Sequence, residues 1–163
     1  MKVNPEVTKE SEVSIRDITK DTCWEICQLS VSDKQKNFVD SAAESMAEAN
    51  FYDNAWFQGI YADEEPVGFL MLDSRPSERK YIVWRFLIDS RYQGMGFGRT
   101  ALRLLIAYVQ NQEQAAELLT SVVMEEGGPL GFYEKSGFKL TGEYWGREAV
   151  MKLELKTNMK DPK

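Results

Sequence analysis

The stretch that decides the fold is Arg91-Tyr92-Gln93-Gly94-Met95-Gly96-Phe97-Gly98-Arg99, in which three glycines stand at alternate positions. It follows residues 81–88, whose apolar, aromatic and β-branched side chains predict a buried strand. It precedes residues 100–110, in which large apolar side chains recur at helical spacing. A glycine-rich turn between a strand and a helix exposes bare backbone amides beside the positive end of the helix dipole. The stretch therefore predicts a phosphate cradle.

Two well-known phosphate-binding motifs do not fit this stretch. A P-loop requires Gly-x4-Gly-Lys-Ser/Thr, and no Lys precedes Thr100. A dinucleotide fingerprint requires Gly-x-Gly-x-x-Gly and an acidic residue about 20 positions on, where this chain has the neutral residues 118–121. A glycine-rich turn that binds no ligand remains the structural alternative.

Read as Gln93-x-x-Gly96-x-Gly98, the loop resembles the acyl-CoA pyrophosphate loop of the GNAT superfamily of N-acetyltransferases, Gln/Arg-x-x-Gly-x-Gly/Ala. A second segment, residues 131–138, resembles the Phe-Tyr-x-x-x-Gly-Phe of the same superfamily. In that family the Tyr lies near the acetyl-CoA sulfur and is proposed to protonate the leaving thiolate. The resemblance therefore makes Tyr133 a candidate catalytic acid, and a core Tyr is the alternative.

The resemblance covers residues 13–155 and implies a single-domain α/β, GNAT-like fold. We expect a mixed central sheet of six or seven strands, a splayed V between two central parallel strands, and about four flanking helices. The domain should span residues 1–163, with flexible ends at 1–11 and 157–163. The resemblance also places the pantetheine arm of the co-substrate acetyl-CoA in the V. The cofactor-binding residues that it implies are Phe86, Leu87, Ile88, Gln93, Gly94, Met95, Gly96, Phe97, Gly98, Arg99 and Tyr133.

Hydrophobic periodicity and turn residues predict the individual elements. The expected strands are residues 13–17, 55–61, 67–72, 81–88, 118–124, 138–144 and 149–155. The expected helices are residues 22–29, 33–50, 100–110 and a short one around Tyr133. In the long helix 33–50, Asp40, Glu44 and Glu48 would fall at i, i+4 and i+8, in one row.

Residues 29–39, 45–49, 66–72 and 85–94 look like the spermine/spermidine (diamine) acetyltransferase branch. The acceptor implied is a primary amine of a small polyamine or diamine, which attacks the thioester directly. Glu44 and Glu48 are candidate bases, and a solvated acidic helix face is the alternative reading of both. A protein N-terminal or lysine acetyltransferase and a non-catalytic acyl-CoA-binding module also stay open. One departure is Glu126, where many relatives have an Asn that contacts pantetheine.

Composition limits the remaining function classes. The chain has 163 residues, no His and two Cys, which disfavours a metal site and excludes His-based nucleophilic machinery. Its net charge of −6 disfavours nucleic-acid and anionic-membrane partners and suits a small cationic amine. No apolar run is long enough to span a membrane. We therefore expect a cytoplasmic enzyme, and leave a homodimer as an open alternative.

Overall fold

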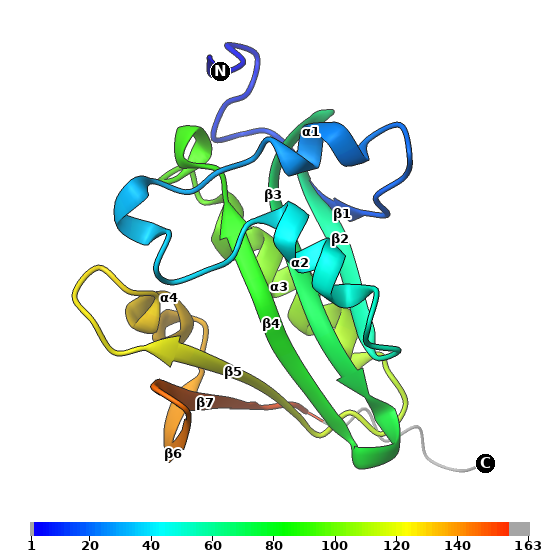
Figure 1. The fold of residues 1–163 in the computed structure, drawn as a ribbon, viewed down its shortest axis with the longest axis vertical. Coiled ribbons are helices and arrows are strands. Elements are labelled where there is room, and N and C mark those ends of the chain that lie inside the picture. The colour runs from blue at the N-terminus through cyan, green and yellow to red at the C-terminus, as the bar shows by residue number, and fades with distance from the viewer. Residues whose placement is uncertain (1, 157–163) are drawn as a thin grey trace.

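The computed structural model describes residues 2–156, which form one mixed sheet in the order β1-β2-β3-β4-β5-β7-β6 (Figure 1). Its strands are β1 (Val13–Arg16), β2 (Ala55–Ala62), β3 (Glu65–Arg75), β4 (Lys80–Ile88), β5 (Glu117–Val123), β6 (Lys139–Trp145) and β7 (Glu148–Glu154). The α-helices of this region are α1 (Cys23–Cys27), α2 (Ala42–Ala49), α3 (Phe97–Gln110) and α4 (Leu130–Lys135). Short 3-10 turns occur at η1 (Asp33–Gln35), η2 (Pro76–Glu78) and η3 (Ser90–Tyr92). The predicted α/β fold with a mixed sheet is confirmed.

The centre of the sheet is its parallel pair, β4 and β5. Their pairing covers four residues on each strand, Lys80–Val83 against Glu117–Thr120, and the neighbouring pairs within residues 2–156 are antiparallel. Beyond Val83 and Thr120 the two strands separate, as the green and yellow arrows of Figure 1 show. The predicted V is therefore present, and the β5-facing edge of residues 84–88 lacks a strand partner within the described chain.

A β-bulge interrupts β4 next to this parting. Met71 of β3 lies opposite Arg85, and the next residue, Leu72, lies opposite Val83, so Trp84 is the extra residue. Before the bulge, Tyr81 and Val83 pack into the core under α3. After it, the alternation is shifted by one residue, and Arg85 follows Trp84 onto the face that α2 covers.

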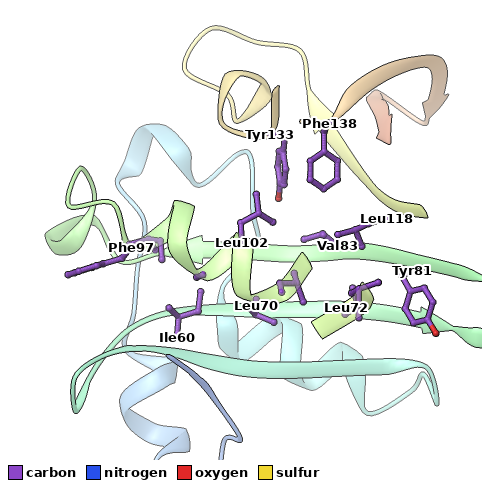
Figure 2. Close-up of a cluster of buried hydrophobic side chains, with 14 of the residues drawn as sticks. Ile60, Leu70, Leu72, Tyr81, Val83, Phe97, Leu102, Leu118, Tyr133 and Phe138 are labelled. Carbon is purple, nitrogen blue, oxygen red and sulfur yellow. The ribbon is translucent and has the colours of Figure 1, made fainter. Parts of the chain in front are cut away.

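The sheet separates two hydrophobic cores. Helices α3 and α4 cover one face, where Leu102 of α3 and Tyr133 of α4 join residues of β3, β4 and β5 (Figure 2). Helices α1 and α2 cover the other face of the β1–β4 half, with Ile26 and Ala42 against Phe69 (Figure 1). The face beside β5 and β7 that α1 and α2 do not reach borders the cavity described below.

The prediction of one helix over residues 33–50 is wrong. The chain forms only the turn η1, runs on through residues 36–41, and begins α2 at Ala42. The physical reason is a capping box: Ser41 Oγ accepts the Glu44 amide at 3.1 Å, and the Glu44 carboxylate accepts the Ser41 amide at 3.0 Å. Asp40 consequently lies outside the helix, and the predicted row of three carboxylates is broken.

Flexible ends were expected at residues 1–11 and 157–163, and the structure describes residues 2–11 of these. Asn4 donates its amide to the Tyr92 hydroxyl at 3.1 Å, and Val7 is buried in the core under α3. The N-terminal segment therefore packs against the glycine-rich loop. The expectation for residues 157–163 lies outside the described residues. No helix within residues 2–156 is both long and apolar enough to cross a bilayer.

Replacement of Ser41 by Ala tests the capping box. Loss of an N-cap side chain typically costs about 1 kcal/mol of folding free energy, which corresponds to roughly 2–4 °C in Tm for a domain of this size. Calorimetry should therefore detect a small drop in Tm. An unchanged Tm would show that the helix start does not depend on this cap.

Candidate active site

The glycine-rich loop has the backbone geometry of an open anion site. Gly94 and Gly96 adopt φ of 76° and 88°, in the left-handed region that favours glycine. A Cβ built on either would meet no atom within 4 Å, so the space beside both residues is open. Helix α3 begins after Gly96, and no side chain of the described chain caps it. Its first amides therefore remain available to a ligand.

Gly98 is needed for another reason. A Cβ at this position would lie 3.3 Å from Ile88 Cγ1 and 3.5 Å from the Phe132 ring. Its absence lets the first turn of α3 sit close to the end of β4 and to α4. The loop, the open edge of β4 and the helix that carries Tyr133 are thereby brought together.

Asp89 fixes the start of the glycine-rich loop, and this role was not predicted from the sequence. Its buried carboxylate accepts the Arg91 amide at 3.0 Å, Arg91 Nε at 2.7 Å and the Ser30 amide at 2.9 Å. Burial alone would raise the pKa of the Asp89 carboxyl, but these hydrogen bonds outweigh it and hold the pKa below its usual value. The sequence signal that could have identified this role is an Asp placed directly after a buried strand.

Gln93 connects the loop to the segment before α2. Its Nε2 donates to the Ile88 carbonyl at 2.8 Å and to Gln35 Oε1 at 2.9 Å. The side chain predicted to bind cofactor thus ties the end of β4 to η1. Residues 36–40 follow η1 along the cavity wall and end at Asp40.

A cavity of about 1220 Å³ runs from the glycine-rich loop through the V and along the sheet face beyond it. The predicted cofactor residues that line it are Phe86, Leu87, Ile88, Gln93, Gly94, Gly96, Phe97, Gly98, Arg99 and Tyr133. Met95, the remaining one, packs against the hydrophobic core. The structure therefore brings nearly all of the predicted cofactor residues to one cavity, in which their individual roles stay predictions.

Tyr133 lies where β4 and β5 part. Its ring packs edge-on against Phe132 and Phe138, with centroids 5.2 and 5.3 Å away. The hydroxyl is directed from α4 toward the sheet (Figure 2). Burial raises the pKa of Tyr133 to about 12, against a smaller lowering by a hydrogen bond with the Thr120 side chain. The phenol therefore keeps its proton at neutral pH and can act as a donor toward the cavity.

An ion-pair cluster joins β4 to α2. Arg85 Nη2 donates to Asp40 Oδ2 at 2.7 Å and to Glu48 Oε2 at 2.9 Å. Asp40 lines the cavity, and Glu48 supports the same guanidinium from α2. Two carboxylates share one cation, so the cluster as a whole has a net negative charge, and Asp40 and Arg85 are its members that line the cavity. Sequence periodicity brought Glu48 into consideration but gave no partner for Arg85, because the partners come from distant segments.

The other candidate positions lie apart from this cluster. Glu44 is exposed, and its carboxylate is occupied by the capping box, whose hydrogen bonds lower the pKa of Glu44. Glu126 is exposed, while the cavity is lined by the neighbouring Gly127 and Gly128. Gly128 is tightly enclosed, because a Cβ there would lie 2.9 Å from the carbonyls of Glu125 and Val123. The predicted catalytic role of Glu44 stays a prediction.

The comparison that decides the family is a match between residues 18–138 and the sequence pattern of the acetyltransferase (GNAT) family. The chain belongs to this family. GNAT members carry out N-acetyl transfer, so the enzyme reading holds and the predicted resemblance is confirmed. The open amides of the glycine-rich loop and the unpaired edge of β4 are chemically suited to the diphosphate and pantetheine of coenzyme A.

Three individual proteins show which GNAT members this chain resembles. The chain is 29% identical to the spermine/spermidine N(1)-acetyltransferase of Bacillus subtilis over 153 residues, 88% of this chain and 99% of the relative. It is 32% identical to the Escherichia coli peptidyl-lysine N-acetyltransferase YjaB over 79 residues, 48% of this chain and 46% of the relative. Among solved structures, it resembles the spermidine N-acetyltransferase of Vibrio cholerae in complex with CoA and spermine. That similarity has a TM-score of 0.69 at 17% identity and covers 89% of this chain and 96% of the other.

Replacement of Gly96 by Val tests the cradle of this GNAT protein. A β-branched residue is strained at φ 88°, and its side chain would enter the open space beside the loop amides. We expect the Kd for coenzyme A, measured by calorimetry, to rise by at least about tenfold, the equivalent of 1.4 kcal/mol.

A matched control is Gly131→Ala in α4, where a Cβ meets no atom within 4 Å. This variant should bind coenzyme A normally. Equal affinities in Gly96→Val and the unmodified chain would remove the cradle from the account.

Proposed function

We propose that this protein transfers the acetyl group of acetyl-CoA to a primary amine of a small polyamine or diamine. The observation that carries the proposal is the continuity of one cavity from the glycine-rich loop, past Tyr133, to the carboxylate of Asp40. Similarity over 88% of this chain to a spermine/spermidine N(1)-acetyltransferase supports the choice of acceptor. Acetyl-CoA supplies an activated thioester, and the residues below would position it and move protons around it.

Backbone groups are the main holders of the co-substrate in this proposal. The amides of residues 94–99 would bind the diphosphate, and the open edge of β4 at Phe86 and Ile88 would pair with the pantetheine arm. An amide near Leu87 would donate to the thioester carbonyl, where negative charge develops during attack. Fixing the thioester in this way contributes to the rate by removing the entropy cost of bringing two reactants together.

The acceptor must reach the thioester as a neutral amine. An alkyl ammonium has a pKa near 10.4, so only roughly one molecule in 2,500 is neutral at pH 7. Asp40, supported by Arg85 and Glu48, would attract the cation to the cavity. A carboxylate that stabilises the ammonium also opposes its deprotonation, so we assign Asp40, which lines the cavity, to binding. The ammonium would lose its proton through water, and Glu44 and Glu48 are the proposed bases.

Tyr133 would stabilise the sulfur of coenzyme A as it leaves. A thiol has a pKa of about 8.5, well below the value of about 12 for this buried phenol. Full proton transfer from Tyr133 to a thiolate is therefore unfavourable, whereas a hydrogen bond from its hydroxyl is available throughout. We propose that this hydrogen bond stabilises the thiolate as the bond to the acetyl carbon breaks.

The alternative acceptor is a lysine side chain or the N-terminus of a protein. The partial match to a peptidyl-lysine N-acetyltransferase favours keeping it, although that match covers only 48% of this chain. An amine panel with detection of the released thiol separates the two. Turnover of spermidine and diamines without turnover of peptides supports the proposal, and the reverse result would replace it.

Replacement of Tyr133 by Phe removes the hydroxyl and keeps the packed ring. A hydrogen bond aimed at developing negative charge typically contributes at least about 100-fold, so kcat should fall by that order while the Kd for coenzyme A stays almost unchanged. Because the pKa of Tyr133 is raised to about 12, its titration should cause no loss of kcat in the unmodified enzyme between about pH 7 and pH 10. A normal kcat in the variant would remove Tyr133 from the chemistry.

Replacement of Asp40 by Asn or of Glu48 by Gln tests the acceptor cluster. Each variant removes one negative charge beside Arg85, and we expect the amine KM to rise by about tenfold at saturating acetyl-CoA. Glu25→Gln, an exposed change of equal charge on α1, is the control and should leave KM unaltered. Glu44→Gln retains the ability to form a capping box, so a fall in its kcat would specifically support the predicted role of Glu44 as base.

A further inference from the structure

On the acceptor side of the cavity, the charge of the side chains that β4 contributes changes along the strand. Lys80, Ile82 and the bulge residue Trp84 stand at alternate positions of β4, share the face opposite the core of Tyr81 and Val83, and line the cavity. Arg85 and its two carboxylates lie further along the same strand, directly after the bulge at Trp84. At about 3.3 Å per residue, Lys80 is roughly 15 Å along β4 from Arg85.

Lys80 is a half-buried cation that the neighbouring carboxylates do not pair with. Glu117 lies beside it in the register of β5 but pairs with Lys152 at 3.6 Å. Asp73, further along the wall, is bound by Arg75 through three contacts of 2.9 to 3.2 Å. Among residues 2–156, no carboxylate lies within 4 Å of the Lys80 ammonium.

The Lys80 ammonium instead lies over the ring of Trp145, 5.6 Å from its centroid. Trp145 also lines the cavity, on the wall formed by the β6–β7 hairpin. An aromatic face is the neutral group best suited to bind a substrate ammonium. Here the chain's own cation occupies that face, so a substrate ammonium arriving at this end meets repulsion and finds its aromatic site taken.

We propose that Lys80 is a specificity-determining residue that limits how far the positive charge of the acceptor can extend. This inference rests on the proposed function and narrows its substrate class. A short diamine keeps both nitrogens between the thioester and the Asp40–Glu48 cluster. A longer polyamine places a further ammonium near Lys80, where two like charges in a partly desolvated groove repel each other. The enzyme therefore prefers diamines to spermidine and spermine.

The test is a comparison of kcat/KM for 1,3-diaminopropane, 1,4-diaminobutane, spermidine and spermine in three proteins. These are the unmodified chain, Lys80→Gln, and the control Lys139→Gln, which removes an equal charge from an exposed position outside the cavity. In Lys80→Gln the ratio of kcat/KM for spermine to that for the diamines should rise by about tenfold, and less at high salt. The control should keep the original ratio, and Lys80→Arg should preserve the discrimination.

Three results have distinct meanings. A rise in the spermine-to-diamine ratio confined to Lys80→Gln, with an unchanged Tm, supports the inference. Turnover of these amines with the same ratio in Lys80→Gln and Lys139→Gln overturns the role of Lys80 and leaves the proposed function intact. Failure of the unmodified chain to acetylate any amine of the series overturns the proposed function, and the specificity role falls with it.

Discussion

Strands β4 and β5 pair through Lys80–Val83 and Glu117–Thr120 and then separate, which leaves backbone groups of β4 without a strand partner in the described chain. Unpaired amides and carbonyls at the centre of a domain are costly unless a ligand or solvent satisfies them. The parting also opens the cavity between the two halves of the sheet, and α4 places Tyr133 beside it. The bulge at Trp84 adds to this by bringing Trp84 and Arg85 to the same face. The proposed co-substrate and acceptor sites thus meet at one break in the sheet.

The loop that follows β4 is held by contacts with segments far away in the sequence. Asp89 binds the Ser30 amide, and Gln93 binds Gln35, so the glycine-rich loop and the segment leading to Asp40 share hydrogen bonds. Asp40 in turn pairs with Arg85 on β4. The same few contacts therefore position the amides that we propose bind the diphosphate and the carboxylate that we propose attracts the acceptor.

Local signals were enough to predict much of this arrangement. The strand before the glycines, the helix after them and the turn at Gly137 are set by neighbouring residues, and the structure has all three. Helix 33–50 was mispredicted because its periodicity continues through a capping box that starts α2 nine residues late. The partners of Arg85 and the isolation of Lys80 depend on which segments the fold brings together. No local pattern contains that information.

The central claim is that backbone amides after β4 bind the diphosphate of coenzyme A while its pantetheine arm fills the V. A crystal structure of the complex with coenzyme A tests it most directly. The account predicts diphosphate oxygens within hydrogen-bond distance of amides in residues 94–99, and pantetheine paired with the edge of β4 near Phe86 and Ile88. Coenzyme A bound elsewhere, with those amides facing only water, would contradict it.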